Sequence, residues 1–406
     1  MSKADWLIYN GQVLAETCLL PRGFVCLQGE RIASLGEDWR GIEARRRIDA
    51  GGRLIGPGFI DLHTHGIADV DFLQSDPESV LRGLSLYASF GVTRVLGSTY
   101  ANQYETIIAQ LHRLRSVMQD RERGALLHGV HLEGPWLSPR CRGGHELEYL
   151  RTPERQDVER ILGEVGDVIR TVTFSPELPG ALWLTERLCL AGIVPVLGHT
   201  AASFEEAEQA IRAGARHVTH MYEATIGYRE SEVQPLVMLP GMETAVLLED
   251  AVSIELIGCP LHVPPPFFRF LDKVKPRDKK VIVTDSLVGT GMPDGSVLSI
   301  KGGRQIYVDQ GVLRLIDKDP AVNGNFCGSA ITMNVALRRL REYARLSTAD
   351  AVRWGSLNPA TTLGLQRETG SLLAGKLADL VIMDEDFNVE TTFVKGRLAY
   401  QNRTET

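Results

Sequence analysis

Eight short apolar runs that alternate with helical patterns constrain the fold of this chain most strongly. The runs cover residues 59–62, 92–97, 127–132, 168–174, 193–197, 217–219, 252–257 and 280–283. Apolar residues recur at helical spacing in the intervals 79–90, 104–118, 153–165 and 203–213. Strands that alternate with helices predict parallel βα units, and eight such units predict a TIM (β/α)8 barrel. Two further helical stretches, 330–344 and 347–354, follow the eighth run and are expected to pack outside the barrel.

Both ends of the chain have a different character, with short strands broken by turns. Asn10-Gly11 and Gln28-Gly29 mark turns near the start, and Lys395-Gly396 marks one near the end. We therefore predict an α/β fold with a small β-sandwich domain built from both termini, residues 1–52 and 370–406. The barrel domain is expected to cover residues 53–369.

Composition and charge narrow the classes of partner. With a net charge of −7, this chain of 406 residues is not expected to bind nucleic acid, whose phosphates select basic surfaces. It shows no secretory signal and no apolar stretch long enough to span a bilayer, so no membrane contact is expected. The six cysteines are scattered without a Cys-x-x-Cys pair, which favours reduced thiols over a cysteine zinc site. These features predict a cytoplasmic protein.

Polar residues suited to metal chemistry follow five of the predicted strands. They are His63 and His65 after the first, Glu133 after the third, His199 after the fifth, His220 after the sixth and Asp285 after the eighth. Catalytic groups of a TIM barrel project from the carboxyl ends of its strands, so these side chains are expected to meet at one barrel mouth. In the His-x-His pair, alternate strand residues face the same side and can share one metal ion.

This set of side chains predicts metal-assisted hydrolysis. Imidazole and carboxylate without thiolate suit Zn²⁺ best, and Fe²⁺ or Mn²⁺ less well. A bound ion lowers the pKa of water, and a general base must then accept the water proton and return it to the departing amine. Asp285, the last residue of the series, is the candidate for that base.

Other polar residues have a plainer interpretation. His128, His131 and His217 lie within predicted strands and are expected to be hydrogen-bonded structural side chains. His112 lies in a charged helical stretch and is expected to face solvent. The three prolines at 264–266 predict a stiff loop.

Several motifs resemble a known family. The run PGFIDLHTHG (57–66) resembles the first-strand signature of the amidohydrolase superfamily. The run HLEGPW (131–136), followed by GGH (143–145), resembles the N-acetylglucosamine-6-phosphate deacetylases more specifically. Further matching segments are GHT (198–200), THMY (219–222), VTD (283–285), GSAITM (328–333) and, near the end, GSL (370–372) with AGKLADL (374–380). The resemblance therefore spans nearly the whole chain.

The resemblance implies a role for each matching residue. Glu133, His199 and His220 would bind the principal divalent ion, and Asp285 would act as general base and then as general acid. His63 and His65 match a second-metal pair that only some members keep, so one or two ions are expected. The fourth strand is followed by Ser175 and offers no bridging lysine, so Glu133 would bridge two ions. The family also implies a homodimer.

The substrate-binding positions match the family less well. The resemblance assigns substrate contacts to His145, His262, Tyr222, Glu223, Ala224 and Arg229. Glu223-Ala224 stands where the family usually has Asn-Ala near the sugar phosphate, and Glu146-Leu147 stands where it tends to have Asn-Pro. Cys259-Pro260 likewise replaces Asp-Gly before the seventh-strand histidine. An ionised Glu223 would repel a phosphate dianion, so phosphate binding in the family's usual manner is not expected. Phosphate could still bind if the Glu223 side chain turned away, or if Arg229 or an arginine of a partner subunit neutralised it.

The sequence therefore predicts a metal-dependent enzyme that hydrolyses an N-acyl, and specifically an N-acetyl, amide of a small amino-sugar substrate. N-acetylglucosamine 6-phosphate is the default substrate. Alternatives are a non-phosphorylated N-acetyl sugar or a different amide, such as an N-acyl amino acid or a cyclic amide. A catalytically inactive scaffold of the same fold is a third class, but the chain keeps every expected metal ligand, which argues against it.

Overall fold

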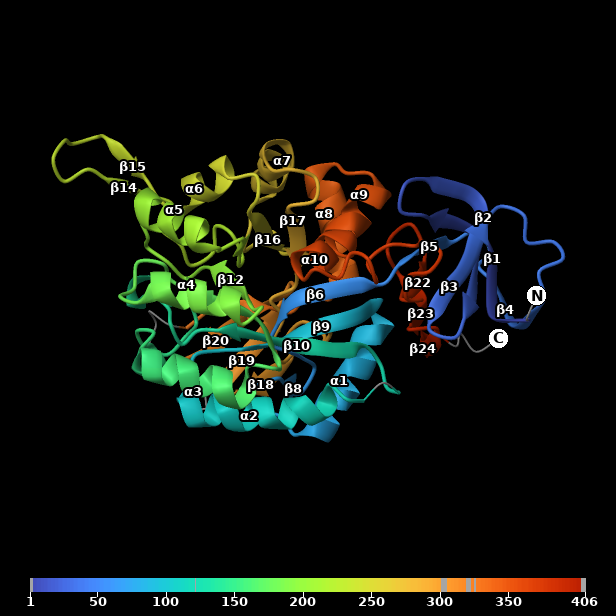
Figure 1. Ribbon diagram of the computed structural model, residues 1–406, viewed down its shortest axis with the longest axis horizontal. Coiled ribbons are helices and arrows are strands. Elements are labelled where there is room, and N and C mark those ends of the chain that lie inside the picture. Colours follow the sequence, from blue (N-terminus) through green and yellow to red (C-terminus); the bar gives the residue numbers. More distant parts are fainter. Residues whose placement is uncertain (1–2, 121, 301–304, 319–322, 325, 403–406) are drawn as a thin grey trace.

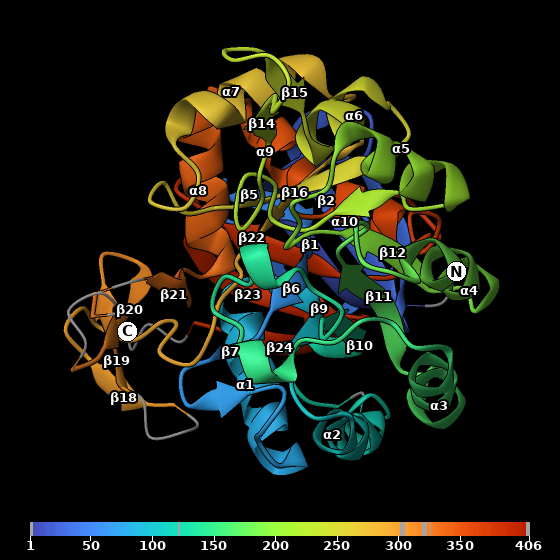
Figure 2. The ribbon, with the colours of Figure 1, turned by 90° about the vertical axis from the view of Figure 1, so that its left-hand side faces the viewer.

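Eight parallel strands form a nearly closed barrel at the centre of the molecule (Figures 1 and 2). The computed structural model describes residues 3–120, 122–300, 305–318, 323–324 and 326–402. The first and last strands meet where the backbone N–H of Asp285 donates to the carbonyl of His63 at 2.9 Å. The strands, in sequence order, are β6 (Phe59–Thr64), β9 (Val92–Thr99), β10 (Leu126–Glu133), β11 (Ile169–Phe174), β12 (Val194–Leu197), β13 (His217–Val218), β16 (Ser253–Ile257) and β17 (Lys280–Val283). The predicted barrel and all eight predicted strands are confirmed.

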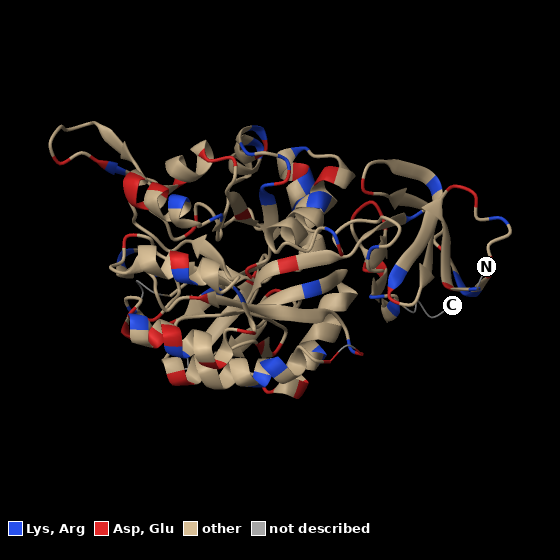
Figure 3. Ribbon diagram, viewed as in Figure 1, with Lys and Arg blue, Asp and Glu red and all other residues tan. Residues whose placement is uncertain are grey.

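The strands are apolar because both of their faces are covered. Every residue of β6 and of β9 is buried, since side chains fill the barrel interior and helices pack outside. The helices are α1 (Pro77–Ser89), α2 (Tyr104–Val117), α3 (Arg155–Val165), α4 (Ala181–Leu190), α5 (Phe204–Ala213), α6 (Met242–Leu248), α7 (Pro265–Val274), α8 (Met333–Ala344), α9 (Thr348–Trp354) and α10 (Leu357–Thr362). Figure 3 shows acidic and basic residues interspersed over the outer helices.

Local capping defines where several helices begin. The Asp76 side chain accepts from the backbone N–H of Ser79 at the start of α1, and Ser203 and Glu206 form a capping box at the start of α5. The interpretation of residues 264–266 as a loop was wrong, because Pro265 and Pro266 open α7. A proline fits the first turn of a helix, where its missing N–H would have no partner.

A small sheet separates the eighth strand from α8, where we expected the helix to follow directly. It consists of β18 (Val297–Ser299), β19 (Gln305–Asp309), β20 (Val312–Ile316) and β21 (Phe326–Ser329). Strands β19 and β20 bury Ile306, Val308 and Leu313 in a small core of their own. This sheet lies beside the barrel mouth in Figure 2.

The two ends of the chain form a separate, mostly antiparallel sheet at the right of Figure 1. Its strands are β1 (Ala4–Leu14), β2 (Leu19–Gln28), β3 (Arg31–Gly36), β4 (Ala44–Asp49), β5 (Leu54–Pro57), β22 (Leu380–Met383), β23 (Val389–Val394) and β24 (Arg397–Gln401). Strand β5 joins the two ends by pairing with β1 and β22, and it leads directly into β6. The division into domains at residues 52/53 and 369/370 stays a prediction.

Two short hairpins extend the loops at the barrel mouth. One pairs β7 (Gly66–Ile67) with β8 (Val70–Asp71), and the other pairs β14 (Tyr228–Glu230) with β15 (Met238–Pro240). The second hairpin projects away from the barrel at the upper left of Figure 1. Among the described residues, each helix falls short of the length and apolarity that a membrane crossing requires.

Candidate active site

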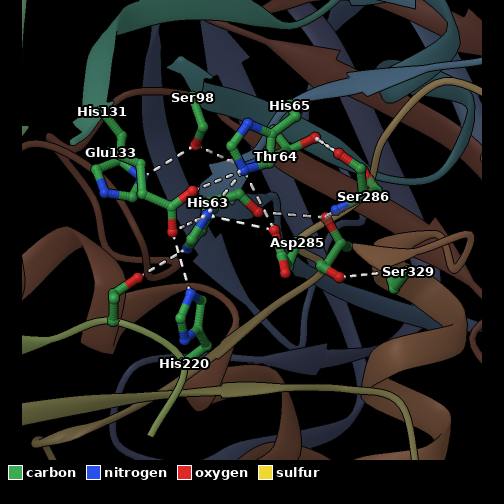
Figure 4. Close-up of polar contacts among 12 residues, drawn as sticks. His63, Thr64, His65, Ser98, His131, Glu133, His220, Asp285, Ser286 and Ser329 are labelled. Atoms are coloured by element: carbon green, nitrogen blue, oxygen red, sulfur yellow. Dashed lines mark hydrogen bonds and ion pairs between the residues drawn. The ribbon is translucent and has the colours of Figure 1, made fainter. Parts of the chain in front are cut away.

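All six residues that the sequence placed at strand ends lie together at one mouth of the barrel. Figure 4 shows His63, His65, Glu133, His220 and Asp285 pointing toward a common centre. His199 joins them from the turn after β12, with its Nε2 atom 3.2 Å from Oε1 of Glu133. These side chains are buried or nearly so, which removes them from competing contacts with bulk water.

Glu133, His199 and His220 form the first tight group. The Nε2 atoms of the two histidines lie 3.1 Å apart, and Oε1 of Glu133 lies 3.1 Å from Nε2 of His220. Zinc–nitrogen bonds of about 2.0–2.1 Å in a tetrahedral site place neighbouring ligand atoms roughly 3.3 Å apart. The observed spacing therefore fits one shared ion.

His63, His65 and Asp285 form a second tight group. The Nε2 atoms of the two histidines lie 3.2 Å apart, and Oδ1 of Asp285 lies 3.3 Å and 3.4 Å from them. The Glu133 carboxylate lies between the groups: Oε1 is 3.3 Å from Nε2 of His63, and Oε2 is 3.2 Å from Nε2 of His65. This placement suits a carboxylate that bridges two ions.

Hydrogen bonds on the far side of the ring orient two of these histidines, His199 and His63. Nδ1 of His199 lies 2.9 Å from the carbonyl of Cys141, which holds Nε2 toward Glu133. Nδ1 of His63 lies 2.9 Å from Oγ1 of Thr219 and 3.3 Å from Oε2 of Glu255. Such outer contacts fix the ring tautomer so that a lone pair faces the metal. The donor set therefore fits a divalent ion without thiolate ligands. Three sets of side chains bring their ligand atoms close enough to hold an ion: His63, His65 and Asp285; His63, Glu133 and His220; and Glu133, His145 and His199.

The electrostatics of the centre keep its carboxylates ionised. Burial opposes ionisation of Glu133, but the neighbouring rings of His63, His145 and His199 outweigh it and lower the pKa of this carboxyl well below its usual range. The pKa of Asp285 is also lowered, because the rings of His63 and His65 outweigh the effect of burial. Burial lowers the pKa of His199 to about 4, so this ring is neutral. Around His63 and His65 the carboxylates of Glu133 and Asp285 outweigh burial: the pKa of His65 is raised to about 9 and that of His63 well above its usual range, so a bound cation would have to displace protons from these rings.

Unusual backbone conformations aim these side chains inward. His199, His220 and Asp285 each lie two residues after the end of a strand and have φ angles of 50°, 22° and 47°. Left-handed backbone at a non-glycine residue costs on the order of 1 kcal/mol or more and persists where the surrounding structure demands it. Tyr222 and Ala224, in the turn after His220, share this conformation. The strained backbone conformations therefore lie in the turns that contain the site residues.

A cavity of about 480 Å³ opens beside this centre. His145, His262, Glu223 and Ala224, four of the six residues predicted to bind substrate, line it. Nδ1 of His145 accepts from the backbone N–H of Ala101 at 3.1 Å, so the neutral ring carries its proton on Nε2, which faces Glu133. His145 is therefore a hydrogen-bond donor at the edge of the centre.

The other two predicted substrate residues, Tyr222 and Arg229, are not among the residues that line the cavity. Tyr222 packs its ring against Phe267 of α7, with ring centroids 4.3 Å apart. Arg229 lies in β14 of the projecting hairpin. Both nitrogens of His262 are buried without a partner among the described residues, which leaves them free to meet a ligand.

Sequence reasoning missed two buried carboxylates that support the site. Oε1 of Glu255, on β16, lies 2.9 Å from Nε2 of His217, while its other oxygen faces His63. Asp61, on β6, accepts from the hydroxyl of Thr284 at 2.6 Å and so joins the first strand to the last. Glu255 and Asp61 each lie within an apolar run of the sequence. An acidic residue inside such a run is the feature that could have indicated a buried, functional carboxylate.

Three histidines outside the centre behave as the sequence indicated, whereas the hydrogen bond expected of a fourth, His128, stays a prediction. Nδ1 and Nε2 of His131 lie 3.0 Å and 2.7 Å from the hydroxyls of Ser98 and Thr173, and both nitrogens of His217 are also hydrogen-bonded. These two are structural, as predicted. His112 is exposed on α2, also as predicted. His128 is half-buried in β10.

Comparison with known proteins relates the whole chain to one group of enzymes. The family model described as "Amidohydrolase family" matches residues 54–399. An N-acetylgalactosamine-6-phosphate deacetylase of Escherichia coli O157:H7 is 31% identical over 85% of this chain and 88% of its own length. An N-acetylglucosamine-6-phosphate deacetylase of Bacillus subtilis (strain 168) is 29% identical over 97% of each chain.

Solved structures agree with this relationship. A mutant N-acetyl-D-glucosamine-6-phosphate deacetylase from Mycobacterium smegmatis, in complex with N-acetyl-D-glucosamine-6-phosphate, superimposes with a TM-score of 0.86 at 30% identity. The match covers 98% of this chain and 100% of that one. The chain is an enzyme of the amidohydrolase family and belongs, within it, to the N-acetylglucosamine-6-phosphate deacetylase family.

Proposed function

We propose that this enzyme hydrolyses the N-acetyl amide of an amino sugar and releases acetate and the free amine. The observation that carries the proposal is the position of the Glu133 carboxylate between two groups of imidazoles, with Asp285 beside one of them. The relatives named above remove acetyl groups from amino-sugar phosphates, which supports the same reaction class.

Within this proposal, Glu133, His199 and His220 hold the principal divalent ion, and His63 and His65 with Glu133 hold a second one. Zn²⁺ is the proposed metal, with Fe²⁺ or Mn²⁺ as alternatives, because the donors are nitrogen and oxygen atoms. When bound, a divalent ion polarises the amide carbonyl and lowers the pKa of water enough to supply a nucleophile near neutral pH.

The proton transfers fall to Asp285. Its low pKa leaves it ionised at neutral pH, so Oδ1 can accept the proton that water loses on attack. The same carboxyl then returns this proton to the amine nitrogen as the carbon–nitrogen bond breaks. His145 and His262 line the cavity and are proposed to hold the substrate by hydrogen bonds.

Two forms of the sugar remain as candidate substrates. N-acetylglucosamine 6-phosphate is the default, since the relatives' names carry the 6-phosphate. The unphosphorylated N-acetyl sugar is favoured by the acidic residues that line the cavity. An amidohydrolase acting on an N-acyl amino acid or a cyclic amide is the wider alternative.

We also propose a cytoplasmic homodimer. The hairpin β14–β15 and its tip expose apolar side chains, among them Val233 and Leu236 at 94% and 89% exposure, and Arg229 lies at its base. A second copy would cover this surface. Light scattering should give twice the monomer mass, and the Val233→Asp/Leu236→Asp double variant should reduce it to one chain.

A substrate panel tests the proposed reaction. The enzyme is stripped with a chelator, reloaded with Zn²⁺, Fe²⁺ or Mn²⁺, and assayed for acetate release from N-acetyl sugars with and without a 6-phosphate, N-acetyl amino acids and cyclic amides. We expect release from an N-acetyl sugar only after reloading. Turnover of the amino acids or cyclic amides alone would replace the proposal with the wider alternative.

A further inference from the structure

The turn that carries His199 is held by the segment after the fourth barrel strand. No proposed metal ligand comes from that strand, β11, which is followed by Ser175, Pro176 and Glu177. His199 lies two residues after β12 with a φ angle of 50°. This left-handed conformation costs a non-glycine residue on the order of 1 kcal/mol or more, so contacts with the rest of the structure must offset the cost.

The hydroxyl of Ser175 joins two loops that carry proposed metal ligands. It donates to the carbonyl of His199 at 2.6 Å and accepts from the backbone N–H of Ser138 at 2.6 Å. Ser138 belongs to the loop that follows Glu133, and its N–H also lies 3.1 Å from the carbonyl of His199. Ser175 is fully buried, so bulk water does not compete for these hydrogen bonds.

The loop that contains Ser138 also holds the ring of His199. The carbonyl of Ser138 accepts from the backbone N–H of Cys141 at 3.0 Å. The carbonyl of Cys141 in turn accepts from Nδ1 of His199 at 2.9 Å. Both the backbone and the ring of His199 therefore depend on the position of residues 138–141, and the hydroxyl of Ser175 ties these residues to the end of β11.

Glu177 holds the next part of the same turn. Its Oε2 atom accepts from the hydroxyl of Thr200 at 2.5 Å, and its Oε1 atom accepts from the backbone N–H of Ala201 at 2.8 Å. A carboxylate forms stronger hydrogen bonds than a neutral acceptor does. Ser175 and Glu177 together thus contact three consecutive residues, 199–201.

We propose that Ser175 and Glu177 are positioning residues that hold the His199 turn in its left-handed conformation and thereby set the affinity for the principal metal ion. The inference rests on the metal centre of the proposed function. Ser175 acts through His199, and the described lining of the cavity does not include it. The fourth strand, which supplies no proposed ligand, would contribute to the site through the backbone of the ligand that follows the fifth.

Titration of the metal-free protein with Zn²⁺ against a competing chelator tests the role of Ser175. Ser175→Ala should lower the affinity for the principal ion by about tenfold or more, as loss of an outer contact to a ligand typically does. The affinity for the second ion, at His63 and His65, should fall by a smaller factor. Ser356→Ala is the matched control, because it removes an equally buried hydroxyl that donates to the carbonyl of Val352 at 2.6 Å. It should bind both ions as the wild type does.

A second variant tests Glu177 by the same titration. Glu177→Gln should also lower the affinity for the principal ion, because an amide accepts weaker hydrogen bonds than a carboxylate does. Its control is Glu186→Gln, which makes the same change on the exposed face of α4 and should leave the affinity unchanged.

Urea denaturation of the metal-free proteins separates positioning from general stability. A lower free energy of unfolding in Ser175→Ala with an unchanged metal affinity would make Ser175 a structural residue and overturn its proposed role. An equal fall in the affinities for both ions would overturn it too. A wild type that takes up no divalent ion would instead refute the metal centre of the proposed function. Crystal structures would then decide the inference, since an unmoved His199 turn in Ser175→Ala contradicts it.

Discussion

Oε2 of Glu255 lies 3.3 Å from Nδ1 of His63, although 192 residues separate the two in the sequence. Burial would raise the pKa of Glu255, but its contacts with His217 and His63 lower it well below the usual range. The carboxylate is therefore ionised and holds the His63 ring with Nε2 directed at Glu133 and Asp285. Glu255 is therefore a positioning residue that would act through His63, a proposed metal ligand.

We expect Glu255→Gln to weaken binding of the second metal ion. The neutral amide would hold the His63 ring less firmly than the carboxylate does, and it would make that ring less basic. Loss of such an outer contact typically costs about 10–100-fold in metal affinity. Metal titration with a competing chelator measures the change, and Glu186→Gln is the matched control. An unchanged metal affinity would show that Thr219, 2.9 Å from the same nitrogen, suffices to orient His63.

Asp285→Asn should keep the principal ion and nearly abolish turnover. The proposed ligands of that ion, Glu133, His199 and His220, are untouched, whereas the amide cannot accept the water proton. A positioned general base contributes roughly 10²–10⁴-fold, so kcat should fall by at least about a hundredfold. The measurements are kcat and metal content on the same sample. A smaller fall in kcat would assign proton transfer to another group.

Substitution of the two groups of ligands should have unequal effects on metal content. Glu133→Ala, His199→Ala and His220→Ala should each lose the principal ion together with activity, because a tetrahedral site binds weakly with one ligand removed. His63→Ala and His65→Ala should lose at most the second ion.

Elemental analysis of purified variants distinguishes these cases, and the exposed His112→Gln provides the control. Full metal content in Glu133→Ala would contradict the proposed ligand set.

His128 lies outside the active site and should make the free energy of unfolding depend on pH. Burial, with the guanidinium groups of Arg94 and Arg170, lowers the pKa of this ring to about 4. Between pH 6.5 and 4 the unfolded chain therefore binds a proton that the folded chain does not. Stability that is fully present above pH 6.5 is lost as the pH falls through this window, by at most about 3 kcal/mol. The free energy of unfolding of His128→Gln, measured by urea denaturation, should fall less between pH 7 and 4.5 than that of wild type.

The barrel could be predicted because each strand is an apolar run with turns or helical patterns on either side. Helix α7 was missed because its apolar residues, among them Phe268 and Leu271, follow three prolines that suggested a loop. The sheet β18–β21 was missed because its strands are short and only part of each is buried. In such segments tertiary packing, and not a repeating pattern, decides the structure.

The sequence by itself determined which chemical groups stand at the strand ends, and hence the reaction class. It also determined that Glu223 and Glu146 are acidic. Only the tertiary structure decided which of these groups lie within a few ångströms of one another. Closure of the barrel brings Asp285 within 3.3 Å of His63 and aims the two oxygens of Glu133 at different histidines. It also places Glu223 and Glu146 on one cavity wall. The physical reason is that metal binding and charge repulsion depend on distances of a few ångströms between residues far apart in the chain, and folding sets those distances.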